Sequence, residues 1–170
     1  MRSEPFSESN LEQTLLATGR ELASSQDGGE SAPPLRVIVE GSRRAKRAII
    51  REEIYRIARE LLRNAYRHAQ AQSIEAELRY GDDAFLLVVR DNGKGMDPNV
   101  LEHHGRAGHW GLPGMYERAA GIGARLDVWS EAGAGTEVRL TVPAAIAYEK
   151  SPDGGRFKLL RKMRIYEHRS

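Results

Sequence analysis

The most regular pattern of hydrophobic positions lies in the middle of the chain, over residues 50–70. Apolar side chains recur there every three or four residues, the spacing of one face of an α-helix: Ile50, Ile54, Ile57, Ala58, Leu61 and Ala65. A shorter pattern of the same kind, built mainly from leucines, covers residues 10–25. We therefore predict a long amphipathic helix at 50–70 and a short one at 10–25.

Strand-like patterns occupy five other stretches. Residues 35–40 form a mostly apolar run, and residues 74–80 alternate between apolar and polar, as in a strand with one wet face. Residues 84–90 are apolar on both faces, which favours a central strand. Residues 125–130 and 136–142 alternate again, which predicts two further strands with one buried face each.

The connections between these stretches indicate the fold class. Residues 81–83 and 133–135 are rich in Gly and Asp and predict hairpin turns, so the sheet is at least partly antiparallel. Residues 96–107 are polar and predict an irregular loop, and residues 115–122 predict a helix. Helices covering one face of a mixed, mostly antiparallel sheet give a two-layer α/β sandwich of the α+β class.

Composition divides the chain into three parts. Residues 1–34 hold the N-terminal helix and a linker, with residues 1–9 expected to be disordered; residues 35–143 hold one packed domain; residues 144–170 form a tail. The last 21 residues contain seven lysines and arginines and two acids, so they carry +5, and the preceding residues carry −3 of the net +2. Such a tail is typical of a solvated extension, with a membrane-surface or nucleic-acid role as the alternative.

Absent features limit the function classes. The chain has no cysteine, which excludes disulfides, thiolate metal sites and a cysteine nucleophile. No apolar run approaches the ~20 residues that span a bilayer, and the first residues lack the apolar core of a signal peptide. We expect a cytoplasmic domain that meets a membrane only through a longer parent protein. We also expect it to be a monomer in isolation and to bind no nucleic acid.

Polar residues follow one edge of the long predicted helix. At about 100° per residue, Glu60, Asn64 and Arg67 lie within roughly 60° of each other, and His68 lies between that edge and the core. A solvated helix face is the simplest interpretation of Glu60 and Asn64. Asn has poor helix propensity, however, and Asn64 borders the apolar face, which favours a role beyond solubility.

A second candidate site follows the predicted central strand. Asp91 stands at the strand end, and Gly93 and Gly95 come directly after it. A carboxylate there can accept a hydrogen bond from an exocyclic amine, while the glycines let the backbone approach a flat ring. Asp-Asn-Gly is also ordinary turn chemistry, so a plain turn remains the alternative at this point. The same alternative applies to the glycines near residues 111 and 133.

Four segments in order resemble the motifs of sensor histidine kinases. Residues 60–69 resemble their N box, residues 91–95 their G1 box, residues 108–115 their G2 box and residues 133–136 their final glycine box. The short loop before Gly108, with the string from Gly111 to Arg118, is similar to the nitrate-sensor subfamily. The resemblance covers about residues 35–143 and implies the Bergerat ATP-binding fold, shared with gyrase, MutL and a heat-shock chaperone.

The resemblance also implies a ligand, ATP with Mg²⁺, and a role for each matching residue. Glu60 matches the general base that polarises the attacking imidazole, and Asn64 matches the Mg²⁺ ligand. Asp91 matches the residue that binds the adenine amine, and Thr136 would reach the adenine side through its hydroxyl. The other implied nucleotide contacts are Arg67, His68, Gly93, Gly95, Gly108, Gly111, Leu112, Gly114 and Met115. The loop 96–107 would be a mobile lid, with Trp110 and Leu112 docking when nucleotide is present.

The implied activity is transfer of the γ-phosphoryl group of ATP to a histidine. In the family the acceptor histidine is followed directly by an acid on a dimerising helical hairpin, and none of the five histidines here is followed by one. The acceptor helices are therefore expected upstream, on a segment absent from this chain. The expected partners are those helices and the receiver domain of a response regulator, whose aspartate takes the phosphate.

Other functions remain open on the sequence. The same motifs are compatible with a regulatory module that binds ATP without chemistry, with a Ser/Thr kinase of the anti-sigma type, and, less favourably, with a gyrase- or chaperone-like ATPase clamp. Glu60 argues against pure binding, because binding alone needs no base. A metal site of His103, His104 and His109 is disfavoured, since Glu102 is the only carboxylate near them.

Overall fold

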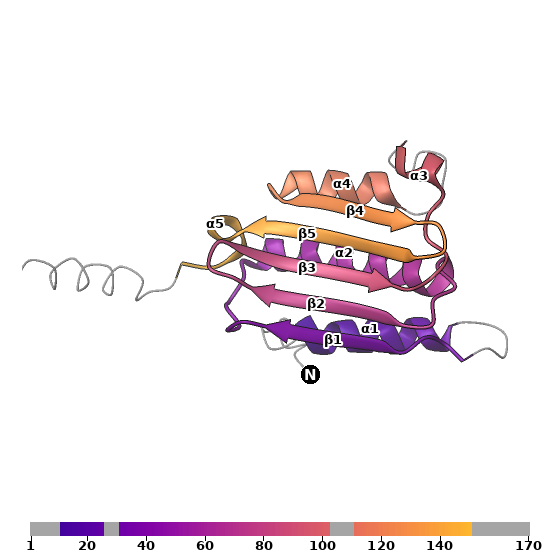
Figure 1. Cartoon of the computed structure of the whole chain (residues 1–170). Coiled ribbons are helices and arrows are strands. Elements are labelled where there is room, and N and C mark those ends of the chain that lie inside the picture. Colours follow the sequence, from indigo (N-terminus) through magenta and orange to yellow (C-terminus); the bar gives the residue numbers. More distant parts are fainter. Residues whose placement is uncertain (1–10, 26–30, 103–110, 151–170) are drawn as a thin grey trace, which may run out of the picture.

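The computed structural model describes residues 11–25, 31–102 and 111–150 (Figure 1). Its sheet contains β1 (Leu35–Glu40), β2 (Ile74–Tyr80), β3 (Ala84–Asp91), β4 (Arg125–Glu131) and β5 (Gly135–Pro143). The strand order is β1-β2-β3-β5-β4, with β1 parallel to β2 and every other pair antiparallel. The predicted mixed, mostly antiparallel sheet is thus confirmed, and β3 is its central strand.

The helices are α1 (Leu11–Ser24), α2 (Ala48–Arg67), α3 (Pro98–Glu102), α4 (Leu112–Gly121) and α5 (Ala144–Ala147). Figure 1 shows α1, α2 and α4 on the same side of the sheet, behind the strands. This confirms the two-layer sandwich. The long helix begins two residues earlier than the apolar pattern predicts and ends at Arg67, three residues before Gln70.

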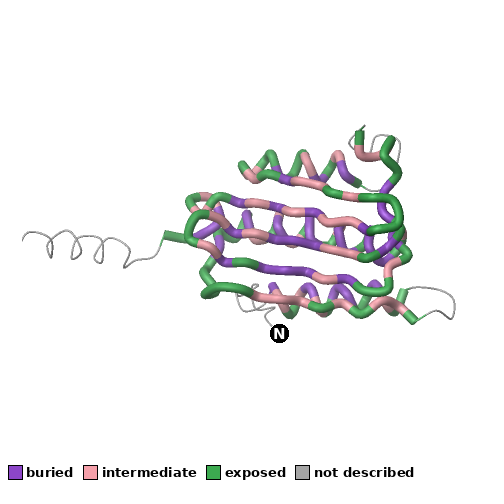
Figure 2. Tube along the Cα trace, in the orientation of Figure 1, coloured by how far each residue is buried: buried purple, intermediate pink, exposed green. Residues whose placement is uncertain are grey.

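The core fills the space between α2 and the inner face of the sheet. Ile54, Ile57 and Leu62 of α2 are fully buried, as are Phe85 and Leu87 of β3. Figure 2 shows the buried positions gathered in the central strands and in the helices behind them. Strand β3 is paired with β2 and β5 on its two edges and packed against α2 on one face. These contacts fix the position of Asp91, the last residue of the strand.

Two segments differ from the sequence prediction. The helix predicted at 115–122 begins at Leu112, because Pro113 is accepted in the first turn, where its missing N–H is not needed. The stretch predicted as wholly irregular contains the short helix α3, whose start is fixed by an Asx hydrogen bond from the Asn99 N–H to Asp97 Oδ1 over 2.7 Å. Residues 103–107 of that stretch lie outside the described residues.

The packed core extends beyond residues 35–143. Leu11, Leu15 and Leu22 of α1 are buried against the rest of the core, and so are Ala147 and Tyr148 after β5. Helix α1 therefore belongs to the helical layer and packs beside α2. The short helix α5 packs at the end of the sheet, directly after β5. The expected disorder of residues 1–9 and the tail beyond residue 150 fall outside the described residues.

The basic segment 42–47, between β1 and α2, contains one residue that is not on the surface. Lys46 is only 1% exposed, and its Nζ lies 4.1 Å from the ring centroid of Tyr80 and 4.3 Å from that of Phe85. A desolvated ammonium over two aromatic rings is stabilised by their negative faces. An isolated β-bridge between Lys46 and Tyr148 adds to this, so the start of α2 is tied to the end of the sheet.

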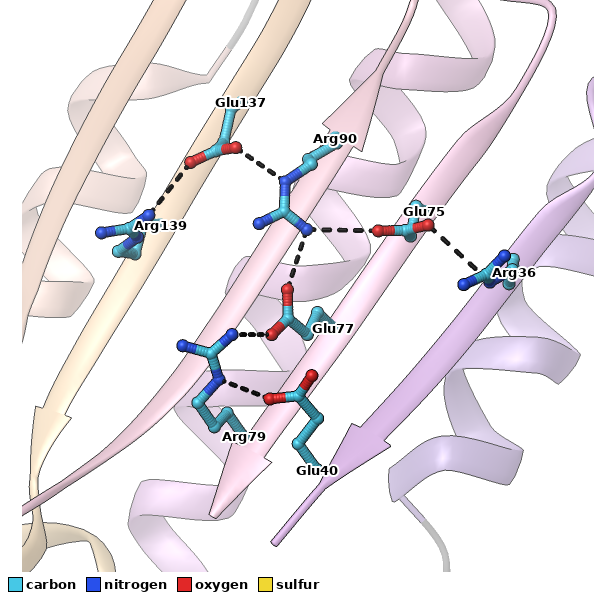
Figure 3. A network of polar contacts seen from close by, with 8 residues as sticks. All are labelled: Arg36, Glu40, Glu75, Glu77, Arg79, Arg90, Glu137 and Arg139. Atoms are coloured by element: carbon cyan, nitrogen blue, oxygen red, sulfur yellow. Dashed lines mark hydrogen bonds and ion pairs between the residues drawn. The ribbon is translucent and has the colours of Figure 1, made fainter. Parts of the chain in front are cut away.

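The outer face of the sheet carries a network of ion pairs (Figure 3). Glu77, 5% exposed, accepts from Arg79 and, over 2.8 Å, from Arg90. Arg90 also donates to Glu137 over 2.7 Å, which links β3 to β5. Burial raises the pKa of Glu77, but the two guanidinium groups outweigh it, so the pKa lies below its ordinary 4.5.

Candidate functional site

The loop after β3 is hydrogen-bonded to the turn that follows α2. The backbone N–H of Lys94 donates to the carbonyl oxygen of Ala69 over 2.7 Å. A Cβ on Gly93 would overlap that same oxygen and stand 2.6 Å from the carbonyl carbon, so no larger residue fits without a backbone shift. The Asp91 loop and the C-terminal end of α2 therefore lie against each other.

Asp91 is the last residue of β3 and stands opposite Thr136 of β5. Its Oδ1 accepts the N–H of Gly93 over 2.9 Å, which turns the chain sharply after the strand. Burial raises the pKa of Asp91 above its ordinary 3.8, although backbone N–H groups of Gly93 and Thr136 act in the opposite direction. The carboxylate of Asp91, at the end of β3, is thus half-buried and poorly hydrated.

A cavity of about 590 Å³ opens beside Asp91. Thr136, Gly135, Ser130 and Leu101 contribute to its lining. Gly135, at φ +98°, lies so close to Asp91 that a Cβ there would overlap the Asp91 carbonyl oxygen. The approach of β5 to the Asp91 loop therefore requires glycine at this point.

The Thr136 hydroxyl lies 2.8 Å from Ser130 Oγ, which also donates to the Gly135 carbonyl over 3.0 Å. Ser130 Oγ in turn accepts the N–H of Met96 over 2.8 Å. Ser130 thus joins β4, β5 and the start of the loop that follows Gly95. The sequence analysis missed Ser130, because a serine on an alternating strand carries no local signal of such contacts.

A second cavity, of about 560 Å³, lies between α2, α4 and the end of α1. Five predicted site residues line it: Glu60, Arg67, Gly111, Gly114 and Met115. The sequence analysis missed the arginines that complete this wall (Arg56, Arg59, Arg63 and Arg118). It also missed Glu21 and Leu22 of α1 and Ser25, which follows that helix. The predicted catalytic and phosphate-side residues are therefore brought together, in a cavity with a strongly cationic rim.

Glu60 points across this cavity toward the start of α4. A Cβ on Gly111, the N-cap of α4 at φ +65°, would stand 2.6 Å from Glu60 Oε1. Arg63 Nη2 donates to the same carboxylate, 2.7 Å from Oε1 and 2.5 Å from Oε2. The i, i+3 spacing of Glu60 and Arg63 is the only sequence signal of this pair.

The remaining predicted residues lie between or beneath the two cavities. Asn64, 4% exposed, sits on α2 one turn after Glu60, and His68 is the half-buried C-cap of the same helix. Leu112 and Met115 are 1% and 2% exposed, and their side chains pack in the core. Gly95 is buried at the turn after Asp91, and Gly108 and Trp110 lie outside the described residues.

The two cavities share no lining residue. Leu101 lines the Asp91 cavity and Gly111 lines the Glu60 cavity, so the stretch 103–110 connects them along the chain. Helix α2 runs from Glu60 to the Asp91 loop: at 1.5 Å per residue, Glu60 and His68 are about 12 Å apart along the axis. The next residue, Ala69, accepts the backbone N–H of Lys94 in that loop.

The described side chains offer no cluster of metal ligands. Within residues 11–25, 31–102 and 111–150, no group of three His, Cys, Asp or Glu side chains could hold a metal ion. The sequence analysis disfavours a metal site at His103, His104 and His109, and these three residues lie outside the described ranges. Mg²⁺ differs from other metals in using one or two protein oxygens together with phosphates and water, so the amide oxygen of Asn64 fits such an ion. In the same part of the chain, no helix is long and apolar enough to cross a membrane.

Comparison with protein families gives one match to this region. The family described as "Histidine kinase-, DNA gyrase B-, and HSP90-like ATPase" matches residues 50–146. This match includes nearly all of α2, the Asp91 loop, α4 and β5. It therefore contains the whole lining of the Asp91 cavity and, apart from residues 21–25, that of the Glu60 cavity.

Several curated relatives are sensor kinases. Sensor histidine kinase LiaS of Bacillus subtilis is 34% identical over 94 residues, 55% of this chain and 25% of that protein. Sensor protein VraS of Staphylococcus aureus is 36% identical over 94 residues, 55% of this chain and 26% of that protein. Sensor histidine kinase YdfH of B. subtilis is 37% identical over 93 residues. The chain thus spans about a quarter of the length of these relatives.

Solved structures share the fold. The blue-light activated histidine kinase EL346 of Erythrobacter litoralis superposes with a TM-score of 0.59 at 23% identity, over 78% of this chain and 41% of that one. A histidine kinase domain of the same protein gives a TM-score of 0.61 at 22% identity, over 81% and 65% of the two chains. At such identity these structures support the arrangement of helices and strands and no further conclusion.

Proposed function

Because the chain belongs to the family of histidine kinase-, DNA gyrase B- and HSP90-like ATPases, we propose that it is the ATP-binding catalytic domain of a sensor histidine kinase. The observation that carries the proposal is the contact of Gly93 and Lys94 with Ala69. It joins the loop that follows Asp91 to the turn after the helix that carries Glu60. A single nucleotide can then meet both.

In this proposal the adenine lies beside Asp91, whose carboxylate accepts a hydrogen bond from the exocyclic amine. Three glycines let the backbone around Asp91 pack this closely, since a Cβ would overlap backbone of Ala69 at Gly93, of Glu131 at Gly95 and of Asp91 at Gly135. Thr136 lines the same cavity. The phosphates run along α2 toward the start of α4, where Gly111 and Gly114 expose the backbone. Helix N-termini favour anions, and a Cβ on Gly114 would meet nothing within 4 Å, so that approach is open.

Charge neutralisation falls to the α2 edge. Asn64 would hold Mg²⁺ through its amide oxygen, and the ion would neutralise charge on the phosphate oxygens. Arg67, exposed at the cavity wall, and His68, at the helix end, would contact phosphate oxygens directly. Asn64 and Arg67 lie within one turn of α2 and His68 is its C-cap, so the spacing of these contacts is set by the helix.

Glu60 is the proposed general base. In the transfer step a ring nitrogen of the acceptor imidazole forms a bond to the γ-phosphorus, the bond from that phosphorus to the β–γ bridging oxygen breaks, and ADP leaves. The proton of the other ring nitrogen is shared with or taken by the Glu60 carboxylate, which makes the imidazole a better nucleophile. The phosphate then passes from the histidine to the aspartate of a receiver domain.

The setting of the domain is also proposed. The acceptor histidine would be on dimerisation helices of a longer kinase of the nitrate-sensor type, and the domain would meet a membrane only through that kinase. Residues 35–143 would form the catalytic unit, with α1 and the tail as its flanks. The isolated domain would be a monomer that binds no nucleic acid.

Phosphoryl transfer to a separately made acceptor hairpin tests this function. The protein, the hairpin and γ-labelled ATP with Mg²⁺ should give an acid-labile, base-stable label on the hairpin, and Glu60→Gln should reduce its rate by about 10²-fold or more. An acid-stable label on a hydroxyl would instead indicate a Ser/Thr kinase of the same fold. Binding of ATP without any label on the hairpin would favour a regulatory module.

A further inference from the structure

Glu60 has a single polar partner among the residues that the structure describes. Arg63, three residues later on α2, places Nη2 within hydrogen-bond distance of both carboxylate oxygens, at 2.7 Å and 2.5 Å. The Glu60 side chain is 22% exposed and that of Arg63 is 48% exposed. The guanidinium thus reaches the carboxylate from the solvent side of the cavity.

On its other side the carboxylate meets the backbone of Gly111. A Cβ there would stand 2.6 Å from Oε1, 3.1 Å from Cδ and 3.3 Å from Cγ of Glu60. Gly111 is at φ +65°, a conformation that favours glycine, and a Cβ there would have to displace the Glu60 side chain. The carboxylate is therefore enclosed between Arg63 and the start of α4.

Three other arginines of this wall are engaged elsewhere. Arg59 pairs with Glu21 of α1 at 3.7 Å, and Arg118 pairs with Glu53 at 3.0 Å. Arg56 pairs with Glu52 and Glu53. Arg67 lines the wall as well, but among the described arginines it is Arg63 whose guanidinium lies within hydrogen-bond distance of Glu60.

We propose that Arg63 is a positioning residue, which holds the Glu60 carboxylate against Gly111 in the orientation that phosphoryl transfer requires. The proposal rests on the proposed function, in which Glu60 acts as the base. A carboxylate has about four lone-pair directions, and one nitrogen leaves most of them free to accept from an imidazole. The pair fixes a long, flexible side chain, and a well-placed base needs such support.

The pair is not expected to hold the fold together. Ion pairs between partly exposed side chains at i, i+3 contribute little to stability. Loss of Arg63 should therefore leave folding nearly unchanged and act on the chemical step. Arg59 offers a matched control, since it lies on the same helix and the same cavity wall but contacts α1 instead of Glu60.

The test compares Arg63→Gln, Arg63→Lys and Arg59→Gln in single-turnover transfer to the acceptor hairpin at saturating ATP, with ATP affinity measured separately. A general base typically contributes about 10²–10⁴-fold to the rate of a reaction. Because Arg63→Gln keeps the base and loses only its positioning, we expect the variant to slow transfer about tenfold. ATP affinity should change less than twofold, Arg63→Lys should recover part of the rate, and Arg59→Gln should match the parent. An unchanged rate in Arg63→Gln, an equal loss in Arg59→Gln, or a loss of ATP affinity as large as the loss of rate would overturn the proposal.

A second measurement needs neither ATP nor acceptor, and so separates this proposal from the proposed function. The amide resonance of Gly111 in ¹H–¹⁵N spectra reports on the carboxylate beside it. It should shift in Arg63→Gln in the same direction as in Glu60→Gln, and it should stay in place in Arg59→Gln. A Gly111 resonance that moves in Glu60→Gln but not in Arg63→Gln would show that Arg63 does not position Glu60, whether or not the parent protein transfers phosphate.

Discussion

Gly93 touches Ala69 so closely that a Cβ on Gly93 would stand 2.6 Å from the Ala69 carbonyl carbon. The next residue, Lys94, donates its backbone N–H to the carbonyl oxygen of Ala69 over 2.7 Å. This contact joins the end of the central strand to the end of α2. The proposed nucleotide site depends on it, because Asp91 belongs to the strand, and Glu60 and Asn64 belong to the helix.

Gly93→Ala tests the contact. The added methyl group cannot be accommodated without moving backbone, so the free energy of unfolding should fall by about 2–3 kcal/mol in denaturant titrations. Gly121→Ala is the control, because a Cβ at the end of α4 would meet nothing within 4 Å and should change stability by about 0.5 kcal/mol or less. Equal stability of the two variants would contradict the close approach.

Asp91→Asn should leave the fold intact at neutral pH or stabilise it. Burial raises the pKa of Asp91, so the folded state favours the protonated carboxyl group. The contribution of this group to the free energy of unfolding is complete below about pH 3.8, the ordinary pKa, and is lost as pH rises through the raised pKa. The amide removes the charge and can still accept the N–H of Gly93. Melting curves of both proteins should show an Asn variant at least as stable at about pH 7, with the difference vanishing in acid.

A clear destabilisation of Asp91→Asn at neutral pH would mean that the charged carboxylate supports the fold. The pKa would then be lowered in the folded state, contrary to the expected effect of burial.

Glu77→Gln should have the opposite pH dependence. The pKa of Glu77 is lowered, so its contribution to stability is present above about 4.5 and is lost as pH falls through the lowered value. Removing a buried carboxylate from Arg79 and Arg90 should cost about 1–2 kcal/mol near pH 7, since both arginines are partly exposed. Denaturant titrations at neutral and acidic pH measure both quantities.

Glu75→Gln is the control for Glu77→Gln. Glu75 is 33% exposed and lies 3.2 Å from Arg90 and 3.7 Å from Arg36, so its removal should change stability by less than half as much. Equal effects of the two variants would show that burial of Glu77 does not matter.

The sequence predicts the architecture well, because each element has a period of its own. The alternation at 74–80 and the apolar run at 84–90 give β2 and β3 nearly residue by residue. The helix start at Leu112 escaped prediction because a glycine- and proline-rich stretch has no apolar period, although Pro113 is typical of a first turn. Burial of Lys46 could not be predicted, since it depends on rings contributed by β2 and β3.

The candidate site was predicted in part. Asp91 and Thr136 face each other because the β3–β5 register puts them opposite, and Glu60 lines one cavity with Arg67 because both are on α2. The sequence did not indicate that two separate cavities exist, or that Ser130 joins β4 to β5. It also did not indicate that the end of α1 forms part of the Glu60 cavity. Such contacts arise between segments far apart in the chain, and no local pattern encodes them.

The central claim is that Asp91 and the α2 edge bind one adenine nucleotide. Calorimetric titration of the protein with ATP and with GTP, both with Mg²⁺, tests it most directly, alongside Asp91→Asn. The adenine amine donates to the carboxylate, whereas guanine presents a carbonyl oxygen at that position, so ATP should bind about tenfold or more tightly than GTP, and Asp91→Asn should weaken ATP binding. Equal affinities for the two nucleotides, or ATP binding that Asp91→Asn leaves unchanged, would contradict the account.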